Sequence, residues 1–108
     1  MAIEETEAYR AYLALIDQLE GEGLHLETRK MFGMPCVAID GRLVGGFYQD
    51  CLVVKLDGHR LEAALAVPGA VNFDPMHGRP MKRWVQIPYA AHERWRDLLA
   101  DAARNPVA

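Results

Sequence analysis

Residues 36–56 have the sequence CVAIDGRLVGGFYQDCLVVKL, and this stretch decides the fold. Three apolar runs are separated by two short polar breaks, Asp40-Gly41 and Gln49-Asp50. An Asp-Gly pair between apolar runs favours a two-residue β-hairpin turn, because both residues of that turn need a positive φ. We therefore predict an antiparallel meander with strands at 36–39, 42–48 and 51–56.

Two-residue turns also determine which residues lie opposite each other on neighbouring strands. The expected pairs are, across the first turn, Ile39–Arg42, Ala38–Leu43 and Cys36–Gly45, and, across the second turn, Tyr48–Cys51, Phe47–Leu52 and Gly45–Val54. Since side chains alternate along a strand, this register divides the meander into two faces and places Cys36 and Cys51 on opposite ones.

The two faces differ in character. The first is wholly apolar, and we expect it to lie under helices; its members are Cys36, Ala38, Leu43, Gly45, Phe47, Leu52 and Val54. The second face is apolar in its middle and charged at its edge, with members Val37, Ile39, Arg42, Val44, Tyr48, Cys51, Val53 and Lys55. A face of this kind is often covered either by more of the chain or by a partner subunit. We expect a homodimer that forms through Val37, Ile39, Val44 and Val53.

The flanking segments complete an α+β pattern. Apolar residues at helical spacing predict a first helix over Glu4–Glu20, with Tyr9, Tyr12, Leu13, Ile16 and Leu19 inward, and a last helix over Ala91–Arg104, with Trp95, Leu98, Leu99 and Ala102 inward. Between them we expect a strand at 24–32, a short helix at 58–67, an irregular loop at 75–80 and a strand at 81–87, and residues 71–74 can add an edge strand. This order predicts an antiparallel sheet of about five strands with the terminal helices mainly on one face, in two layers.

Length and composition exclude several classes of protein. The 108 residues, 51% hydrophobic and 25% charged, are ordinary for one globular domain, which we expect to span residues 1–108. Apolar runs are far shorter than the ~20 residues of a membrane span, and the acidic N-terminus is unlike a signal peptide. Cys36 and Cys51 lack the spacing of a disulfide framework or a metal site. We expect a cytoplasmic protein without metal, cofactor or membrane contact.

The charge is distributed unevenly. The formal net charge is −3, and residues 1–27 hold seven acidic side chains against one base, Arg10. Residues 28–108 are therefore net basic. An acidic first helix and an acidic chain argue against direct nucleic-acid binding, although a local basic patch remains open.

Residues 77–84, HGRPMKRW, form the best candidate for a binding site. The stretch places an imidazole, three cations and an indole beside a glycine, and guanidinium groups bind planar anions in a bidentate way. A second run, Arg29–Pro35, has paired cations beside a Gly/Pro turn. The candidate ligand-binding residues are Lys30, His77, Arg79, Lys82, Arg83 and Trp84. The alternative is that Met81 and Trp84 fill the core while the cations cover a strand edge. Whether the two runs meet in one cleft is open from the sequence.

Motifs for catalysis are lacking. The sequence has no P-loop, no GxGxxG, no HExxH and no GxSxG. A cysteine nucleophile served by His77 is conceivable, but no local motif favours it. We therefore expect a protein that is not an enzyme.

Four segments together resemble the N-terminal domain of the TfoX/Sxy family. They are Lys30-Met31-Phe32-Gly33, Asp40–Gly45, Asp50–Leu56, and the stretch from Phe73 to Arg83–Pro88. The resemblance implies a two-layer α+β domain that stands alone here without the C-terminal domain of longer members. It also implies a non-enzymatic regulatory or protein-interaction role, with an unidentified protein partner, linked to competence for DNA uptake. The alternative is a small-ligand or anion-binding domain that uses residues 77–84.

Overall fold

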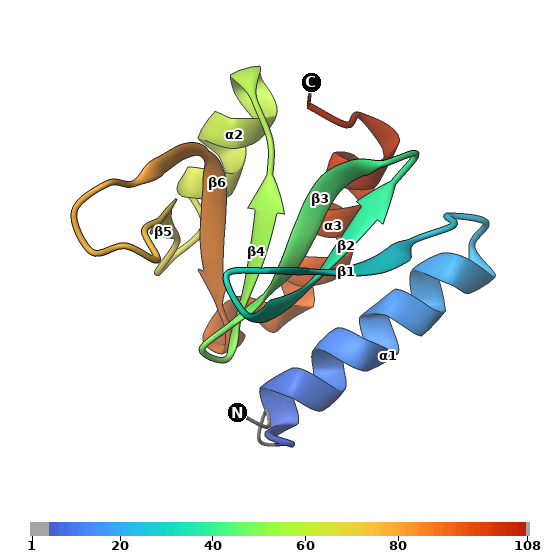
Figure 1. The fold of residues 1–108 in the computed structure, drawn as a ribbon. Helices are drawn as coiled ribbons and strands as arrows, with labels where there is room; N and C mark the ends of the chain where they lie inside the picture. Colours follow the sequence, from blue (N-terminus) through green and yellow to red (C-terminus); the bar gives the residue numbers. More distant parts are fainter. Residues whose placement is uncertain (1–4, 108) are drawn as a thin grey trace.

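The computed structural model describes residues 5–107 and has an α+β architecture (Figure 1). The helices are α1 (Glu7–Gly21), α2 (Gly58–Leu65) and α3 (Trp95–Arg104), with a 3₁₀ helix, η1 (Tyr89–Arg94), directly before α3. The strands are β1 (Glu27–Met31), β2 (Met34–Ile39), β3 (Arg42–Tyr48), β4 (Cys51–Lys55), β5 (Val71–Phe73) and β6 (Met81–Pro88). Glu4, where the first helix was expected to begin, lies outside the described residues.

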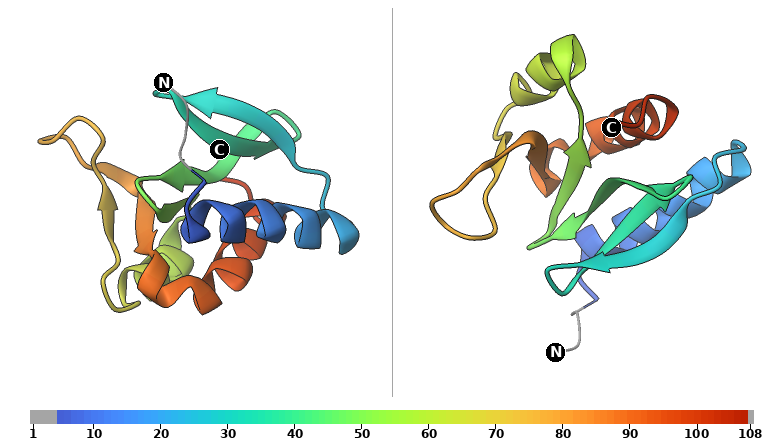
Figure 2. Two further views of the ribbon diagram at one scale, coloured as in Figure 1. Left: turned by 90° about the horizontal axis from the view of Figure 1, so that it is seen from below. Right: turned by 45° about the horizontal axis from the view of Figure 1, so that its top comes forward.

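The strands form one antiparallel sheet in the order β1-β2-β3-β4-β6-β5. It has six strands rather than five, because the edge segment after α2 pairs with β6 as β5. Figure 2 shows α1 and α3 together on one side of the sheet, as the two-layer arrangement predicts. The other side faces the viewer in Figure 1 and is crossed by the tip of the β1–β2 hairpin.

Three two-residue turns connect the first four strands. In each turn both residues have positive φ: 53° and 74° at Phe32-Gly33, 50° and 79° at Asp40-Gly41, and 47° and 62° at Gln49-Asp50. Two consecutive positive φ values are the mark of the type I′ turn, whose twist matches that of the strands. The two turns predicted from the sequence are confirmed, and so is the whole β3–β4 register.

A β-bulge corrects the predicted β2–β3 register. The pairs Ile39–Arg42 and Ala38–Leu43 are confirmed, but Cys36 lies opposite Gly46 and not Gly45. Gly45 lies opposite Val37, so β3 contains one extra residue, Val44, between the two regular pairings. Because side chains alternate, one extra residue shifts the later part of β3 to the opposite face relative to β2.

The bulge changes which residues share a face. Gly46 lies opposite Cys36 on one side and Val53 on the other, so Cys36 is on the face of Val53. Cys51, two residues before Val53 on β4, is on that face too, and the prediction of opposite faces was wrong. Val37 and Val44 are instead buried in the core beneath the helices, where Ile39 also packs. The four residues expected to form a dimer surface therefore do not form one surface.

The main core lies between the sheet and the helices. Tyr12 and Leu19 of α1 are buried there as expected, but Leu13 is 44% exposed, and Ala8 and Leu15 are buried in its place. The C-terminal segment begins as η1 and becomes α-helical only at Trp95. The predicted inward residues of α3 are all buried: Trp95, Leu98, Leu99 and Ala102.

Candidate functional site

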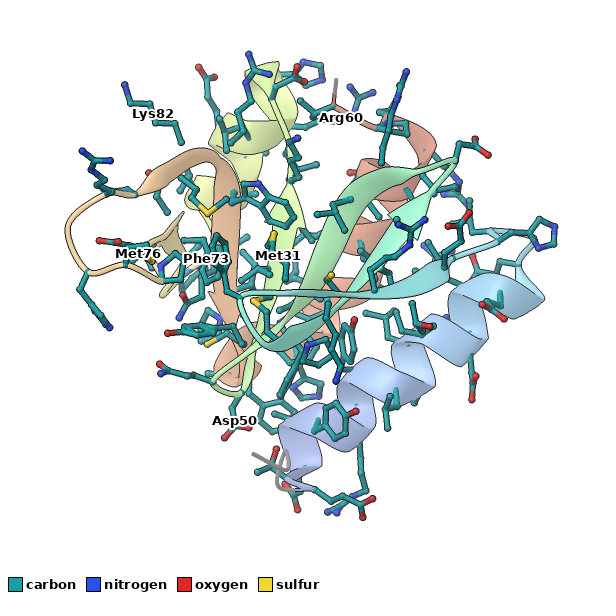
Figure 3. The ribbon with its side chains drawn as sticks, in the orientation of Figure 1. Met31, Asp50, Arg60, Phe73, Met76 and Lys82 are labelled. Atoms are coloured by element: carbon teal, nitrogen blue, oxygen red, sulfur yellow. The ribbon has the colours of Figure 1, made fainter. Side chains whose placement is uncertain are left out.

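The face of the sheet opposite the helices carries a second, smaller core. Met34, Val53, Phe73 and Trp84 are buried in it, with Met31, Leu43, Tyr48 and Met81 packed around them. We call these eight residues the sulfur–aromatic cluster. The ring centroids of Tyr48 and Phe73 are 5.1 Å apart and those of Phe73 and Trp84 6.4 Å, distances typical of interacting aromatic rings. In Figure 3, Met31 lies next to Phe73.

The members of the cluster show that the two candidate runs, Arg29–Pro35 and residues 77–84, meet. Met31 and Met34 belong to the β1–β2 hairpin, and Phe73, Met81 and Trp84 belong to β5 and β6. The two runs do meet over this face, but through apolar side chains. Thioethers next to aromatic rings are favourable core contacts, so the meeting of the two runs builds core packing.

Trp84 belongs to this packing. Its side chain is in the cluster and the residue is only 5% exposed, so its indole has no open face on which a ligand could stack. This is the position that the core interpretation of Trp84 and Met81 predicts.

The loop between β5 and β6 is organised by Asp74. Its carboxylate accepts hydrogen bonds from the backbone N–H of Gly78, at 2.8 and 3.1 Å, and of Arg79, at 3.2 Å. His77 and Gly78 have φ of 53° and 145°, which turns these N–H groups toward one point. Adjacent N–H groups arranged in this way form a concave anion site. In this loop the anion is the protein's own carboxylate.

The cations of the candidate site are exposed and spread out. Lys30, His77, Arg79, Lys82 and Arg83 are all exposed, and none of them forms an ion pair with another described residue. Figure 3 shows Lys82 pointing away from Met31 and Phe73. None of the six residues singled out in the sequence lines the groove beside Leu26 and Ile39 or the groove between α1 and the η1–α3 corner.

Neither cysteine has the environment of a nucleophile. Burial raises the pKa of the Cys36 thiol and of the Cys51 thiol, which disfavours the reactive thiolate. The amide Nε2 of Gln86 lies 3.5 Å from Sγ of Cys51.

Within residues 5–107, no group of three or more His, Cys, Asp or Glu side chains could hold a metal ion. Nor is any helix in that range both long and apolar enough to cross a membrane.

Sequence reasoning missed the exposed apolar residues around the cluster. Phe32 is 60% exposed, Val71 54% and Met76 67%. They flank Met31 and Phe73 in the sequence, and Figure 3 shows Met31 and Met76 on either side of Phe73. We call Phe32, Val71 and Met76 the exposed apolar triad. The sequence did contain a signal for Phe32. Phe32 and Gly33 separate two segments with a strand pattern, and the residue before the glycine of such a turn is usually Asn or Asp.

Comparison with known proteins identifies one family. The profile of the family described as "TfoX N-terminal domain" matches residues 17–105, which include every strand, α2, α3 and the last five residues of α1. No curated protein and no solved structure matches the chain significantly. The family is not a known enzyme family, in keeping with the environment of the cysteines. The resemblance noted in the sequence is thus confirmed over most of the chain, which belongs to the TfoX N-terminal domain family.

Proposed function

We propose that this chain is a non-enzymatic, cytoplasmic regulatory domain that acts by protein–protein contact as a homodimer, and that it takes part in competence-type regulation. The observation that carries the proposal is the conformation of Phe32. This aromatic residue has φ of 53° and is 60% exposed at the tip of the β1–β2 hairpin.

The conformation of Phe32 has a cost within the monomer. A left-handed backbone costs a residue with a Cβ roughly 1–2 kcal/mol, which glycine avoids and Asn reduces. The exposed ring recovers little of this by burial. Phe32 therefore adopts an unfavourable backbone conformation that does not stabilise the monomer. Such residues are expected at functional positions, where the side chain contacts another molecule.

Two further exposed apolar residues flank the sulfur–aromatic cluster in the sequence. Val71 and Met76 are also large, apolar and more than half exposed; Phe32 directly follows Met31 of the cluster, and Val71 lies two residues before Phe73 of the cluster. Aromatic residues and methionine are enriched at the centres of protein interfaces. We therefore move the dimer surface from the four residues expected from the sequence to the exposed apolar triad.

The test compares the self-association of two turn variants by sedimentation equilibrium, from about 1 μM to 1 mM. Phe32→Asn supplies the residue that the turn prefers and removes the ring. We expect it to raise the melting temperature, by roughly 4–8 °C for each kcal/mol gained, while weakening dimerisation at least about tenfold. Gln49→Asn is the matched control, because Gln49 has φ of 47° at the same position of another type I′ turn.

Gln49→Asn should raise stability without altering self-association. Two results would overturn the proposal: a wild-type chain that is monomeric throughout the concentration range, or a Phe32→Asn variant that associates as strongly as the wild type.

A further inference from the structure

Strand β1 is the longer of the two edge strands of the sheet. It stands at one end of the strand order and pairs only with β2, and Figure 2 shows it at the rim of the sheet. It has five residues against three in β5, the other edge strand, and its first four residues, Glu27–Lys30, are all exposed. An open edge of this kind presents backbone N–H and C=O groups to which another strand can bind.

The register of the β1–β2 hairpin determines which backbone groups lie on this open edge. The residues that flank the two-residue turn at Phe32-Gly33 exchange backbone hydrogen bonds, so the second and fourth pairs counted from the turn are not hydrogen-bonded. On β1 these positions are Lys30, opposite Pro35, and Thr28. Pro35 fits this arrangement because it has no N–H to donate. The N–H and C=O groups of Thr28 and Lys30 therefore point away from β2, and no turn or loop within residues 5–107 bonds to them.

The side chains of β1 select one way of pairing. Glu27 and Arg29 lie on the same side of the strand, form an ion pair at 2.6 Å and are each about half exposed. If a second copy of β1 pairs antiparallel with Thr28 opposite Thr28, each Glu27 lies opposite Arg29 of the other copy. A shift by two residues, the smallest that keeps the hydrogen bonds, places Arg29 opposite Arg29 or Glu27 opposite Glu27. Charges on an edge strand normally prevent pairing, but here they permit one register and disfavour its neighbours.

We propose that β1 binds β1 of a second copy of this chain, antiparallel and centred on Thr28, so that one sheet continues through both copies. The backbone groups of the two Thr28 residues bond to each other, and two ion pairs between Glu27 and Arg29 cross the contact. The two Phe32 residues then lie at opposite ends of the paired strands, so this contact is separate from the exposed apolar triad. A chain that uses both surfaces assembles beyond the dimer.

Charge reversal tests the register, by sedimentation equilibrium up to about 1 mM in a Phe32→Asn background, which removes the ring of the triad. Glu27→Arg places two pairs of arginines opposite each other, and Arg29→Glu places two pairs of glutamates opposite each other. We expect each to weaken self-association at least about tenfold. An equimolar mixture of the two variants should associate as the Phe32→Asn parent does, because every charge then faces an opposite one. The half-exposed pair contributes little to stability, so melting temperatures should be nearly unchanged.

Three results would overturn the proposal: a Phe32→Asn parent that is monomeric up to 1 mM, single reversals that associate as the parent does, or a mixture that associates no better than its components. The mixture decides this proposal independently of the previous one, because it leaves the triad of the parent unchanged.

A disulfide trap detects the same contact when it is weak. In a Cys51→Ser background, with Cys36 buried, Thr28→Cys places two thiols on a pair whose Cα atoms are about 5.5 Å apart, within the range of a disulfide. Lys30→Cys is the matched control, since Lys30 is equally exposed on the same side of β1 but lies roughly 13 Å from its copy in this register. With oxidised glutathione, we expect Thr28→Cys to form the linked dimer at least tenfold faster. Equal rates would contradict a contact centred on Thr28.

Discussion

Gly45 lies where the sheet packs tightly against Leu99 of α3. A Cβ at this position would lie 2.6 Å from Cδ1 of Leu99 and 2.9 Å from the carbonyl oxygen of Val53, and real Cβ atoms essentially never approach other atoms so closely. Gly46 is equally confined on the other face, because a Cβ there would lie 2.7 Å from the carbonyl oxygen of Pro35. The Gly-Gly pair thus lets one strand contact a helix on one side and the hairpin on the other.

Gly45→Ala should lower the free energy of unfolding by about 1–3 kcal/mol, because the backbone of β4 and the side chain of Leu99 must both move to admit the methyl group. Denaturant titration measures the change. The control is Gly21→Ala in the last turn of α1, where a Cβ would meet nothing within 4 Å and alanine favours the helix. Equal stabilities of Gly45→Ala and the wild type would contradict the close approach of α3.

At the scale of elements, the features that the turn residues determine can be predicted from the sequence, and the features that depend on other contacts cannot. The hairpin at Asp40-Gly41 follows from the φ requirement of the turn, and the β3–β4 register follows from the next one. The bulge at Val44 has no such signal, because Val44 fits an apolar position whichever way it faces, and two glycines follow it. The exposure of Phe32 and the packing of Met31 and Met34 with Phe73 depend on how the β1–β2 hairpin crosses the sheet, a long-range contact that local patterns do not contain.

The β5–β6 loop offers a prediction at this scale. Asp74→Ala removes the acceptor for the N–H groups of Gly78 and Arg79, and no other hydrogen bond in residues 5–107 replaces it for these two groups. We expect amide hydrogen exchange at both residues to accelerate, while the amides of Val53 and Val85 keep their protection because the sheet is untouched. Unchanged exchange at Gly78 and Arg79 would show that the loop does not depend on the carboxylate.

At the scale of the whole molecule, an ion-pair group joins the C-terminal end of α1 to α3. Glu22, directly after α1, binds Arg96 of α3 and lies 3.9 Å from Arg104. At the opposite end of α1, the Thr6 hydroxyl caps the helix by accepting from the Tyr9 N–H and donates to the carboxylate of Asp50 at 2.7 Å. Thus α1 is fixed at one end to α3 and at the other to the β3–β4 turn.

The Glu22 group makes stability depend on pH. Its hydrogen bond with Arg96 lowers the pKa of Glu22 in the folded state, so the group stabilises the fold above the unfolded pKa of about 4.3 and ceases to do so as pH falls through the lowered value. Glu22→Gln should therefore reduce the melting temperature at pH 7 and have less effect at pH 3. The control is Glu20→Gln, because Glu20 is exposed, lies two residues before Glu22 and is outside the ion-pair group. This control should change the melting temperature at neither pH. A Glu22→Gln deficit that is equal at both pH values would contradict this assignment.

The three two-residue turns have a consequence for how the chain reaches its fold. The pairings β1–β2, β2–β3 and β3–β4 each join strands that are consecutive in the chain, so each of these pairings closes a short loop and loses little chain entropy. The contacts that close the longest loops, between α1 and α3, join residues more than 70 positions apart, as Glu22 and Arg96 do. The meander can therefore form from local encounters, whereas docking of α3 closes the largest loop. Gly45 of β3 leaves the space for Leu99 of α3. It therefore lies at the junction between the local and the long-range parts of folding.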